Sequence, residues 1–337
     1  MMNVLNVLSL FDGMSGAQIA LNRANIPYNR YFASEIDKYA MAVAMHRYPD
    51  TIQLGDVKNI KAYDLPQIDL LIGGFPCQAF SFAGKQLNFD DPRGKLFFEC
   101  VRLLKELNPR YFLFENVKMK KEYQDQISKL IGVEPIEINS NLVSAQNRKR
   151  LYWTNIPNVG QPEDKGILLE DIIENGAISL GLAQRGRYNN GKIEQRYEFN
   201  GTAKSNALTT VSKDSLVFCS VDKFRGQRQL IFQKPHGFNN GGFKALDGKT
   251  PTLSSNSWEQ NNFLLCDKES YRKLTPLECE RLQTIPDNYT KVEGISNSQR
   301  YKMVGNGFTV DVIAHILKNM SKKPIQKIAK QLEFAWN

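Results

Sequence analysis

The stretch that most constrains the fold is residues 69–94, DLLIGGFPCQAFSFAGKQLNFDDPRG. It begins with a short apolar run closed by Gly73 and Gly74, a pattern typical of a buried parallel strand. Pro76 then restricts its own backbone and that of the preceding residue, so Cys77 is presented at the carboxyl end of the strand. A thiol there is a candidate nucleophile, and a buried structural cysteine is the alternative. The stretch predicts an α/β fold with its chemistry at one edge of a parallel sheet.

Composition narrows the class of protein. The 337 residues suffice for about two domains, and 42% hydrophobic and 23% charged residues are typical of a globular chain. A formal net charge of +9 favours a polyanionic partner such as nucleic acid. Five cysteines without a CxxC pair, and only three histidines, indicate neither a zinc site nor a disulfide framework. The chain lacks a membrane-length apolar stretch and a basic signal-peptide start, so we expect a cytoplasmic protein, nucleoid-associated or phage-encoded.

The first forty residues predict half of a nucleotide-binding fold. Residues 3–10 are mostly apolar and predict a buried strand, and residues 11–16 (FDGMSG) form a glycine turn into a helix over 17–24. Residues 31–34 predict a second strand that ends in Glu35, about 20 residues past the turn, where dinucleotide folds place a carboxylate against a ribose. Turn and acid together predict a cofactor that contains adenosine.

Two more acids follow predicted strands. Residues 53–57 predict a third strand with Asp56 at its end, although a solvated carboxylate or a helix cap would explain this acid equally well. Beyond a predicted helix over 96–107, residues 110–114 (RYFLF) predict a strand that leads into Glu115. This acid would reach the sheet edge that presents the candidate nucleophile, which favours catalysis over helix capping.

The segment 137–153 predicts two extended pieces joined by a basic turn. Gln146, Arg148 and Arg150 are spaced two apart, so an extended chain would present all three on one face. A solvated edge strand is the alternative. Near the end of the chain, residues 298–317 predict a loop at Gly-Asn-Gly followed by a helix.

The middle of the chain has a different character. Between residues 155 and 271, Asn, Gly, Ser and Thr become frequent, predicted strands are short, and basic residues recur. We therefore expect four parts: residues 1–155 as a catalytic domain, 156–271 as a smaller domain, 272–297 as a supporting hinge that begins with a Thr-Pro helix start, and 298–337 as a return to the first domain with a basic tail.

These motifs together closely resemble those of the DNA (cytosine-5) methyltransferases of bacteria and phages. The resemblance is carried by GFPCQAFS at 74–81, DPRG at 91–94, ENV at 115–117, Gln-x-Arg-x-Arg at 146–150 and Arg-x-Leu-Thr-x-x-Glu at 272–278. The sequence SLFDG at 9–13 is also similar to that of the eukaryotic de novo DNA methyltransferases. The resemblance implies a Rossmann-like S-adenosylmethionine-dependent methyltransferase sheet with a smaller target-recognition domain of strands and loops.

The resemblance also implies roles for single residues. The residues expected to be catalytic are Cys77 as the nucleophile, Glu115 as the proton-handling acid, Arg150 at the oxygen of the cytosine, and Arg148. Those expected to bind S-adenosylmethionine are Phe11, Gly13, Ser15, Gly16, Glu35, Ile36, Asp56, Val57, Pro76, Leu96 and Asn306. Those expected to contact DNA are Gln78, Ser81, Gln146, Thr252 and Leu253.

The implied activity is sequence-specific methylation of carbon 5 of a flipped-out cytosine in double-stranded DNA, through covalent addition of Cys77 to carbon 6. We expect a monomer without metal or membrane, with a restriction endonuclease as a possible partner. One alternative is a transfer RNA cytosine-5 methyltransferase, which methyl transfer to RNA would reveal. A second is a nicotinamide-dependent oxidoreductase, which rests only on the glycine turn and Glu35 and predicts NAD binding. A third is an inactive DNA-binding relative, but no required side chain is missing.

Overall fold

A computed structural model describes residues 4–76, 95–174, 179–189, 192–199, 203–204, 217–219, 230–233, 242–251, 261–265 and 271–321. The chain forms two compact units. The first contains residues 1–138, 149–161 and 310–337, and the second contains residues 139–148 and 162–309. This division places 139–148 and 272–309 with the second unit, so its boundaries differ from those expected, and the functional assignment of the four parts stays a prediction.

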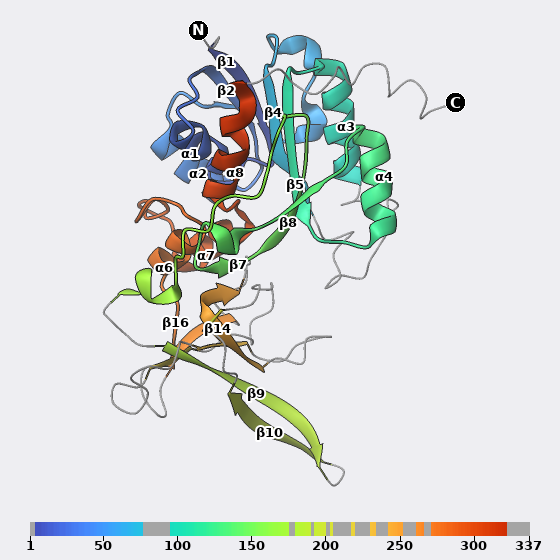
Figure 1. Ribbon diagram of the computed structural model, residues 1–337. Coiled ribbons are helices and arrows are strands. Elements are labelled where there is room, and N and C mark those ends of the chain that lie inside the picture. Colours follow the sequence, from blue (N-terminus) through green and yellow to red (C-terminus); the bar gives the residue numbers. More distant parts are fainter. Residues whose placement is uncertain are drawn as a thin grey trace. The chain divides into compact units, whose positions relative to one another are not determined.

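The first unit is built on one sheet. Its strands are β1 (Leu5–Leu10), β2 (Tyr28–Ser34), β3 (Ile52–Gln53), β4 (Leu70–Gly74), β5 (Tyr111–Val117), β6 (Ile136–Asn139) and β8 (Lys149–Thr154). Their order is β3-β2-β1-β4-β5-β8-β6, parallel from β3 to β5 and antiparallel between β5 and β8. The direction of strand progression reverses between β1 and β4, and open α/β sheets bind ligands at such a point. The expected Rossmann-like sheet is therefore confirmed (Figure 1).

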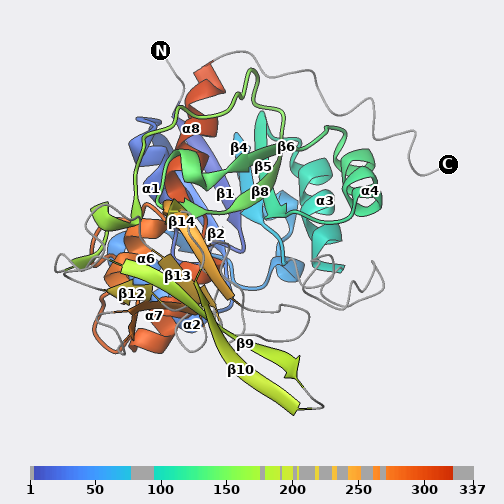
Figure 2. The ribbon, with the colours of Figure 1, turned by 60° about the horizontal axis from the view of Figure 1, so that its bottom comes forward.

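Helices cover both faces of this sheet. They are α1 (Gly16–Arg23), α2 (Lys38–Arg47), α3 (Lys95–Leu107), α4 (Lys121–Ile131) and α8 (Val310–Leu317), with short 3-10 helices η1 (Val57–Asn59), η2 (Ala62–Asp64) and η7 (Lys318–Ser321). The helices α1 and α8 lie side by side on one face, and α3 and α4 lie on the other (Figures 1 and 2). Helix α2 begins after Asp37 because its carboxylate accepts the N–H groups of Tyr39 and Ala40. Among the described residues, no helix is long and apolar enough to cross a bilayer.

Close packing at the centre of the sheet requires a glycine at position 73. A Cβ built on Gly73 would lie 2.8 Å from the carbonyl oxygen of Leu10, its partner on β1. Real Cβ atoms essentially never come this close to a backbone oxygen, so Gly73 lets β1 and β4 approach. The core around them is aromatic and aliphatic, and its largest wholly buried side chains are Trp153, Tyr111, Tyr152, Phe97, Phe112, Phe114, Leu8 and Leu10.

The second unit is rich in strands, as expected. Its elements are η4 (Ser140–Leu142), β7 (Gln146–Asn147), η5 (Leu169–Asp171), β9 (Ser179–Asn189), β10 (Lys192–Phe199), β11 (Ala203–Lys204), β12 (Val217–Cys219), β13 (Leu230–Gln233), β14 (Gly242–Pro251), β15 (Asn261–Leu265), β16 (Tyr271–Lys273), α6 (Pro276–Leu282) and α7 (Asn297–Asn306). The strands β9 and β10 form a long antiparallel hairpin (Figure 2). Helix α6 begins where predicted, because Thr275 and Glu278 form a capping box around Pro276.

Three predicted elements differ from the structure. The third strand covers only β3, because Gly55 turns the chain away at φ 71°. The Gly-Asn-Gly segment predicted as a loop lies mostly in α7, whose helical residues extend to Asn306 and whose C-cap is Gly307. Strand β5 continues through Glu115 to Val117 instead of ending before the acid.

Candidate functional site

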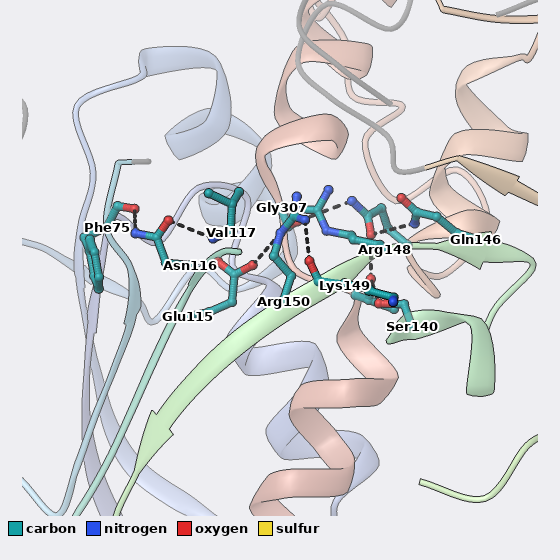
Figure 3. Close-up of polar contacts among 12 residues, drawn as sticks. Phe75, Glu115, Asn116, Val117, Ser140, Gln146, Arg148, Lys149, Arg150 and Gly307 are labelled. Carbon is teal, nitrogen blue, oxygen red and sulfur yellow. Dashed lines mark hydrogen bonds and ion pairs between the residues drawn. The ribbon is translucent and has the colours of Figure 1, made fainter. Parts of the chain in front are cut away.

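The carboxyl ends of β4 and β5 form the edge predicted to carry the nucleophile and the acid. The strand register pairs Gly74 with Glu115. The next residue, Asn116, is only 1% exposed, and its Nδ2 donates to the carbonyl oxygen of Phe75 at 3.1 Å (Figure 3). Its Oδ1 accepts the N–H of Val117 at 2.7 Å. Both the N–H and the oxygen of this amide are therefore bonded, and β5 holds the backbone just beyond the end of β4.

The ring of Phe75 anchors the same point from the other side. It is buried, and its ring centroid lies 4.9 Å from that of Phe97 and 6.3 Å from that of Trp153. Pro76, which follows, is partly buried. Cys77 comes next, and it lies outside the described residues together with the predicted DNA contacts Gln78, Ser81, Thr252 and Leu253. The structure thus fixes the chain up to the residue before the predicted nucleophile.

An ion pair joins the predicted acid to a predicted arginine on the adjacent strand. Arg150 Nε on β8 lies 3.0 Å from Glu115 Oε1 on β5, and each side chain is only 13% exposed (Figure 3). Arg150 Nη1 also donates to the carbonyl oxygen of Lys149 at 2.8 Å. Low exposure strengthens such a pair relative to one in bulk water. Together, the two groups can donate to a carbonyl oxygen and exchange a proton with a ring nitrogen.

The other two polar residues of the Gln-x-Arg-x-Arg motif are held inside the second unit. Arg148 is 4% exposed and donates from Nη2 to the carbonyl oxygen of Gly307 at 3.1 Å. Gln146 is wholly buried, and its Nε2 donates to the carbonyl oxygen of Leu282 at 3.0 Å. The motif is also not one continuous strand, because β7 ends at Asn147 and β8 starts at Lys149. The motif is thus divided between the two units, and both the shared face of its three side chains and the DNA contact of Gln146 stay predictions.

One buried glutamine that the sequence analysis did not single out links this motif to α6 and α7. Gln283 is 0% exposed, accepts from Gln146 at 3.1 Å and Thr309 at 2.9 Å, and donates to the carbonyl oxygens of Val304 at 3.0 Å and Gly307 at 3.3 Å. All of these partners belong to the second unit. Its sequence signal was weak, because a glutamine that follows an amphipathic helix is usually solvated.

The glycine turn and Glu35 come together as the sequence predicts. Gly13 N donates to Glu35 Oε2 at 2.8 Å, and the N–H groups of Ile36 and Asp37 donate to Oε1 at 2.7 and 2.8 Å. The turn enters α1 through Ser15, the N-cap residue, at φ 67°. The carboxylate is thereby fixed at the end of β2, directly beside the turn.

The remaining predicted cofactor residues occupy different settings. Asp56 caps η1 by accepting the N–H of Lys58 at 3.0 Å, so the helix-cap interpretation holds, while part of its side chain stays exposed. Val57 is buried in the core of the first unit, and Leu96 packs against that core. Asn306 is exposed at the end of α7 in the second unit.

The residues around the turn fit an adenosine-bearing group. A Cβ built on Gly13 would meet no atom within 4 Å, so the space beside the turn is open. Ile36 is 74% exposed, which leaves an apolar side chain available to cover an aromatic base. Carboxylates suit the hydroxyl and amino donors of adenosine. Among the described residues, no cluster of His, Cys, Asp or Glu could hold a metal ion.

Comparison with known proteins identifies the family of this chain. The family model for C-5 cytosine-specific DNA methylase matches residues 5–322. The type II methyltransferase M1.ScrFI of Lactococcus lactis subsp. cremoris is 31% identical over 329 residues, which cover 93% of this chain and 77% of that protein. The orphan methyltransferase M.SPRI of Bacillus phage SPR is 29% identical over 451 residues, which cover 97% of this chain and 99% of that protein.

Solved structures agree on the fold. A mutant of DNMT2 from Spodoptera frugiperda superposes with a TM-score of 0.60 at 17% identity, covering 94% of this chain and 100% of that one. Dnmt2 methyltransferase of S. pombe gives a TM-score of 0.57 at 17% identity, covering 93% and 97%. The family match spans both the edge with Glu115 and Arg150 and the turn beside Glu35. This chain therefore belongs to the family of C-5 cytosine-specific DNA methylases and is a DNA (cytosine-5) methyltransferase.

Proposed function

We propose that this enzyme methylates carbon 5 of a flipped-out cytosine in double-stranded DNA through a transient bond between Cys77 and carbon 6 of the base. The observation that carries the proposal is the ion pair of Glu115 and Arg150 on the edge where Phe75 leads into the cysteine loop. Family membership supports DNA as the substrate and implies S-adenosylmethionine as the methyl donor. Flipping is required because the reacting carbons are stacked inside a duplex.

The chemistry divides among three side chains. The thiolate of Cys77 adds to carbon 6, and the electrons of the 5,6 double bond move into the ring, which makes carbon 5 the nucleophilic end of an enamine. Glu115 would deliver a proton to ring nitrogen 3 as this charge develops and would take it back in the last step, while Arg150 donates to the carbonyl oxygen. S-adenosylmethionine, held at the turn beside Glu35, would supply the methyl group for carbon 5 and would leave as the neutral thioether. A base then removes the carbon 5 proton, and the electrons released expel the Cys77 thiolate.

The same proposal assigns the cofactor residues. Phe11 would stack on the adenine, Ile36 would pack against it, Asp56 would accept from its amino group, and Glu35 would accept from the ribose. A carboxylate has about four acceptor positions, and Glu35 already accepts three N–H groups. It can therefore take one ribose hydroxyl without losing a bond, and the second hydroxyl would displace a backbone N–H.

The nucleophile is tested by replacing Cys77 with serine. We expect Cys77→Ser to lose methyl transfer to duplex DNA while keeping its affinity for S-adenosylmethionine. The control is Cys100→Ala, because Cys100 is wholly buried on α3 and burial raises its thiol pKa far above the usual range. Labelled methyl transfer to duplex DNA and to transfer RNA is measured for each variant. Full turnover by Cys77→Ser would refute the assignment, and transfer to RNA alone would establish the RNA alternative.

The covalent step has its own test. Bisulfite sequencing of DNA from cells that express the chain identifies the methylated site, and an oligonucleotide with 5-fluorocytosine at that site then replaces the substrate. Fluorine cannot leave as the proton does, so the last elimination is blocked and the wild-type enzyme should stay attached to the DNA under denaturing conditions. An enzyme that methylates ordinary DNA but never forms this adduct would contradict addition at carbon 6.

A further inference from the structure

The turn of residues 11–16 has a backbone that needs support. Phe11, Gly13 and Ser15 have φ values of 54°, 61° and 67°. Side-chain-bearing residues rarely adopt this left-handed region, so Phe11 and Ser15 must be held there by their surroundings. Two main-chain bonds contribute: Ser15 N donates to the carbonyl oxygen of Asp12 at 3.1 Å, and Asp12 N donates to the carbonyl oxygen of Ser34 on β2 at 3.0 Å. Side chains add further support from beneath the turn.

Asp12 is the centre of a buried hydrogen-bond network beneath this turn. It is 5% exposed, its Oδ1 accepts from the Tyr31 hydroxyl at 2.6 Å, and its Oδ2 accepts from the Ser15 hydroxyl at 2.7 Å. Gln18 on α1 extends the network, since its Nε2 donates to the Ser15 hydroxyl at 2.8 Å and its Oε1 accepts from Tyr28 at 2.8 Å. One carboxylate oxygen thus bonds to strand β2 and the other to the turn itself.

We propose that Asp12 is a positioning residue that holds the turn in its cofactor-binding shape, and that it does so only while ionised. The inference rests on the proposed binding of S-adenosylmethionine at this turn. An ionised carboxylate accepts from Tyr31 and Ser15 at once, whereas a protonated carboxyl uses one oxygen as a donor. Protonation therefore breaks or reverses one of the two bonds, and the residues on either side of Asp12 in the chain, Phe11 and Gly13, lose part of their support.

The electrostatics of the site put this change within an accessible pH range. Burial, with a small contribution from the charge of Glu35, raises the pKa of Asp12 to about 6, and the hydroxyl groups of Ser9, Tyr31 and Ser15 limit this rise. The tyrosines around it are Tyr28, Tyr31 and Tyr48, and burial raises the pKa of each hydroxyl above its ordinary value, so all three stay neutral. Asp12 is therefore ionised above pH 7 and protonated progressively below pH 6, and cofactor affinity should fall as pH falls.

Stability should respond in the opposite direction. Because the pKa of Asp12 is higher in the folded chain than in the unfolded chain, the folded state binds this proton more tightly. Protonation of Asp12 as pH falls through about 6 therefore favours folding while it weakens cofactor binding. A purely structural residue would move both quantities together.

The test is calorimetric titration of the full chain with S-adenosylmethionine from pH 5.5 to pH 8. For the wild type, we expect a dissociation constant that is flat above pH 7 and rises by up to about tenfold per pH unit below pH 6. For Asp12→Asn, we expect a dissociation constant raised on the order of tenfold at pH 7.5, without the rise below pH 6, and an unfolding midpoint no lower than that of the wild type. Wild-type affinity and pH dependence in Asp12→Asn would overturn the inference.

Two tyrosine variants provide a second route if Asp12→Asn does not fold. Tyr31→Phe removes a bond that lowers the pKa of Asp12, so the midpoint of the affinity profile should move to higher pH. Tyr28→Phe is the matched control, because its hydroxyl bonds to Gln18 and not to Asp12, and its midpoint should stay. An unmoved midpoint in Tyr31→Phe would refute the inference. If the wild type binds S-adenosylmethionine equally at all pH values, only the role of Asp12 is refuted. If the wild type does not bind S-adenosylmethionine, the proposed function is refuted.

Discussion

Replacing Asn116 by alanine tests whether β5 holds the segment that leads into Cys77. The Asn116 amide is 1% exposed, donates to Phe75 at 3.1 Å and accepts from Val117 at 2.7 Å. Asn155 offers a matched control near the opposite end of β5, because it is 4% exposed, donates to a backbone carbonyl at 3.0 Å and accepts a backbone N–H at 2.9 Å. Each of the two side chains bonds to one backbone carbonyl and one backbone N–H, but of the two only Asn116 holds the segment that leads to Cys77.

Each alanine variant removes two buried hydrogen bonds, so each should lose about 1–3 kcal/mol of stability. The change should be seen as a lower urea midpoint. If the same bond energy also holds Phe75 where it leads into Cys77, the rate of Asn116→Ala should fall by about 5- to 150-fold. The assay is single-turnover methyl transfer to duplex DNA at saturating cofactor. Equal rates for the two variants, whether both fall or both stay at the wild-type value, would refute the positioning role of Asn116.

Three further substitutions test the packing that supports the site. Gly73→Ala places a methyl group 2.8 Å from the Leu10 carbonyl oxygen and should lower the free energy of unfolding in urea by about 1–3 kcal/mol. The control, Gly160→Ala, meets no atom within 4 Å and should be near neutral. Equal urea midpoints for the two variants would contradict the close approach. Gln283→Ala should lower the melting temperature, since each buried group left unpaired costs about 1–3 kcal/mol, and a wild-type melting curve would contradict its linking role. Thr275→Ala removes the cap of α6 and should cost about 0.5–2 kcal/mol by the same measurement, whereas no change would mean that Pro276 alone starts the helix.

The first sheet could be predicted because its signals are local. Apolar runs closed by glycines identify β1 and β4, and their lengths suit strands rather than helices. The third strand was predicted too long for an equally local reason. Gly55 takes φ 71° and turns the chain out of the sheet, so Asp56 caps η1 instead of ending a strand. A glycine in a short run of residues marks a break in a strand, but the sequence does not show whether the strand lies before or after it.

The buried polar residues could not be predicted, because their partners are far away in the chain. Gln146 and Gln283 are bonded to each other although 137 positions separate them. Glutamine is usually an exposed residue type, so the sequence gives no sign that either side chain is buried. Only the fold shows that they bond to each other inside the protein. The case of Asp12 is similar, since its place in a glycine turn suggests a solvated acid.

The buried acid also explains why this turn need not be made of glycines alone. A turn with left-handed residues can be built from glycine, which has no strain, or from side chains that the surroundings hold in place. This chain uses both, with Gly13 at one left-handed position and Ser15, bonded to Asp12, at another. The second solution makes the shape of the turn depend on a titratable group. Cofactor affinity in this enzyme should therefore depend on pH more steeply than in a relative whose turn is held by glycines and has a small residue in place of Asp12.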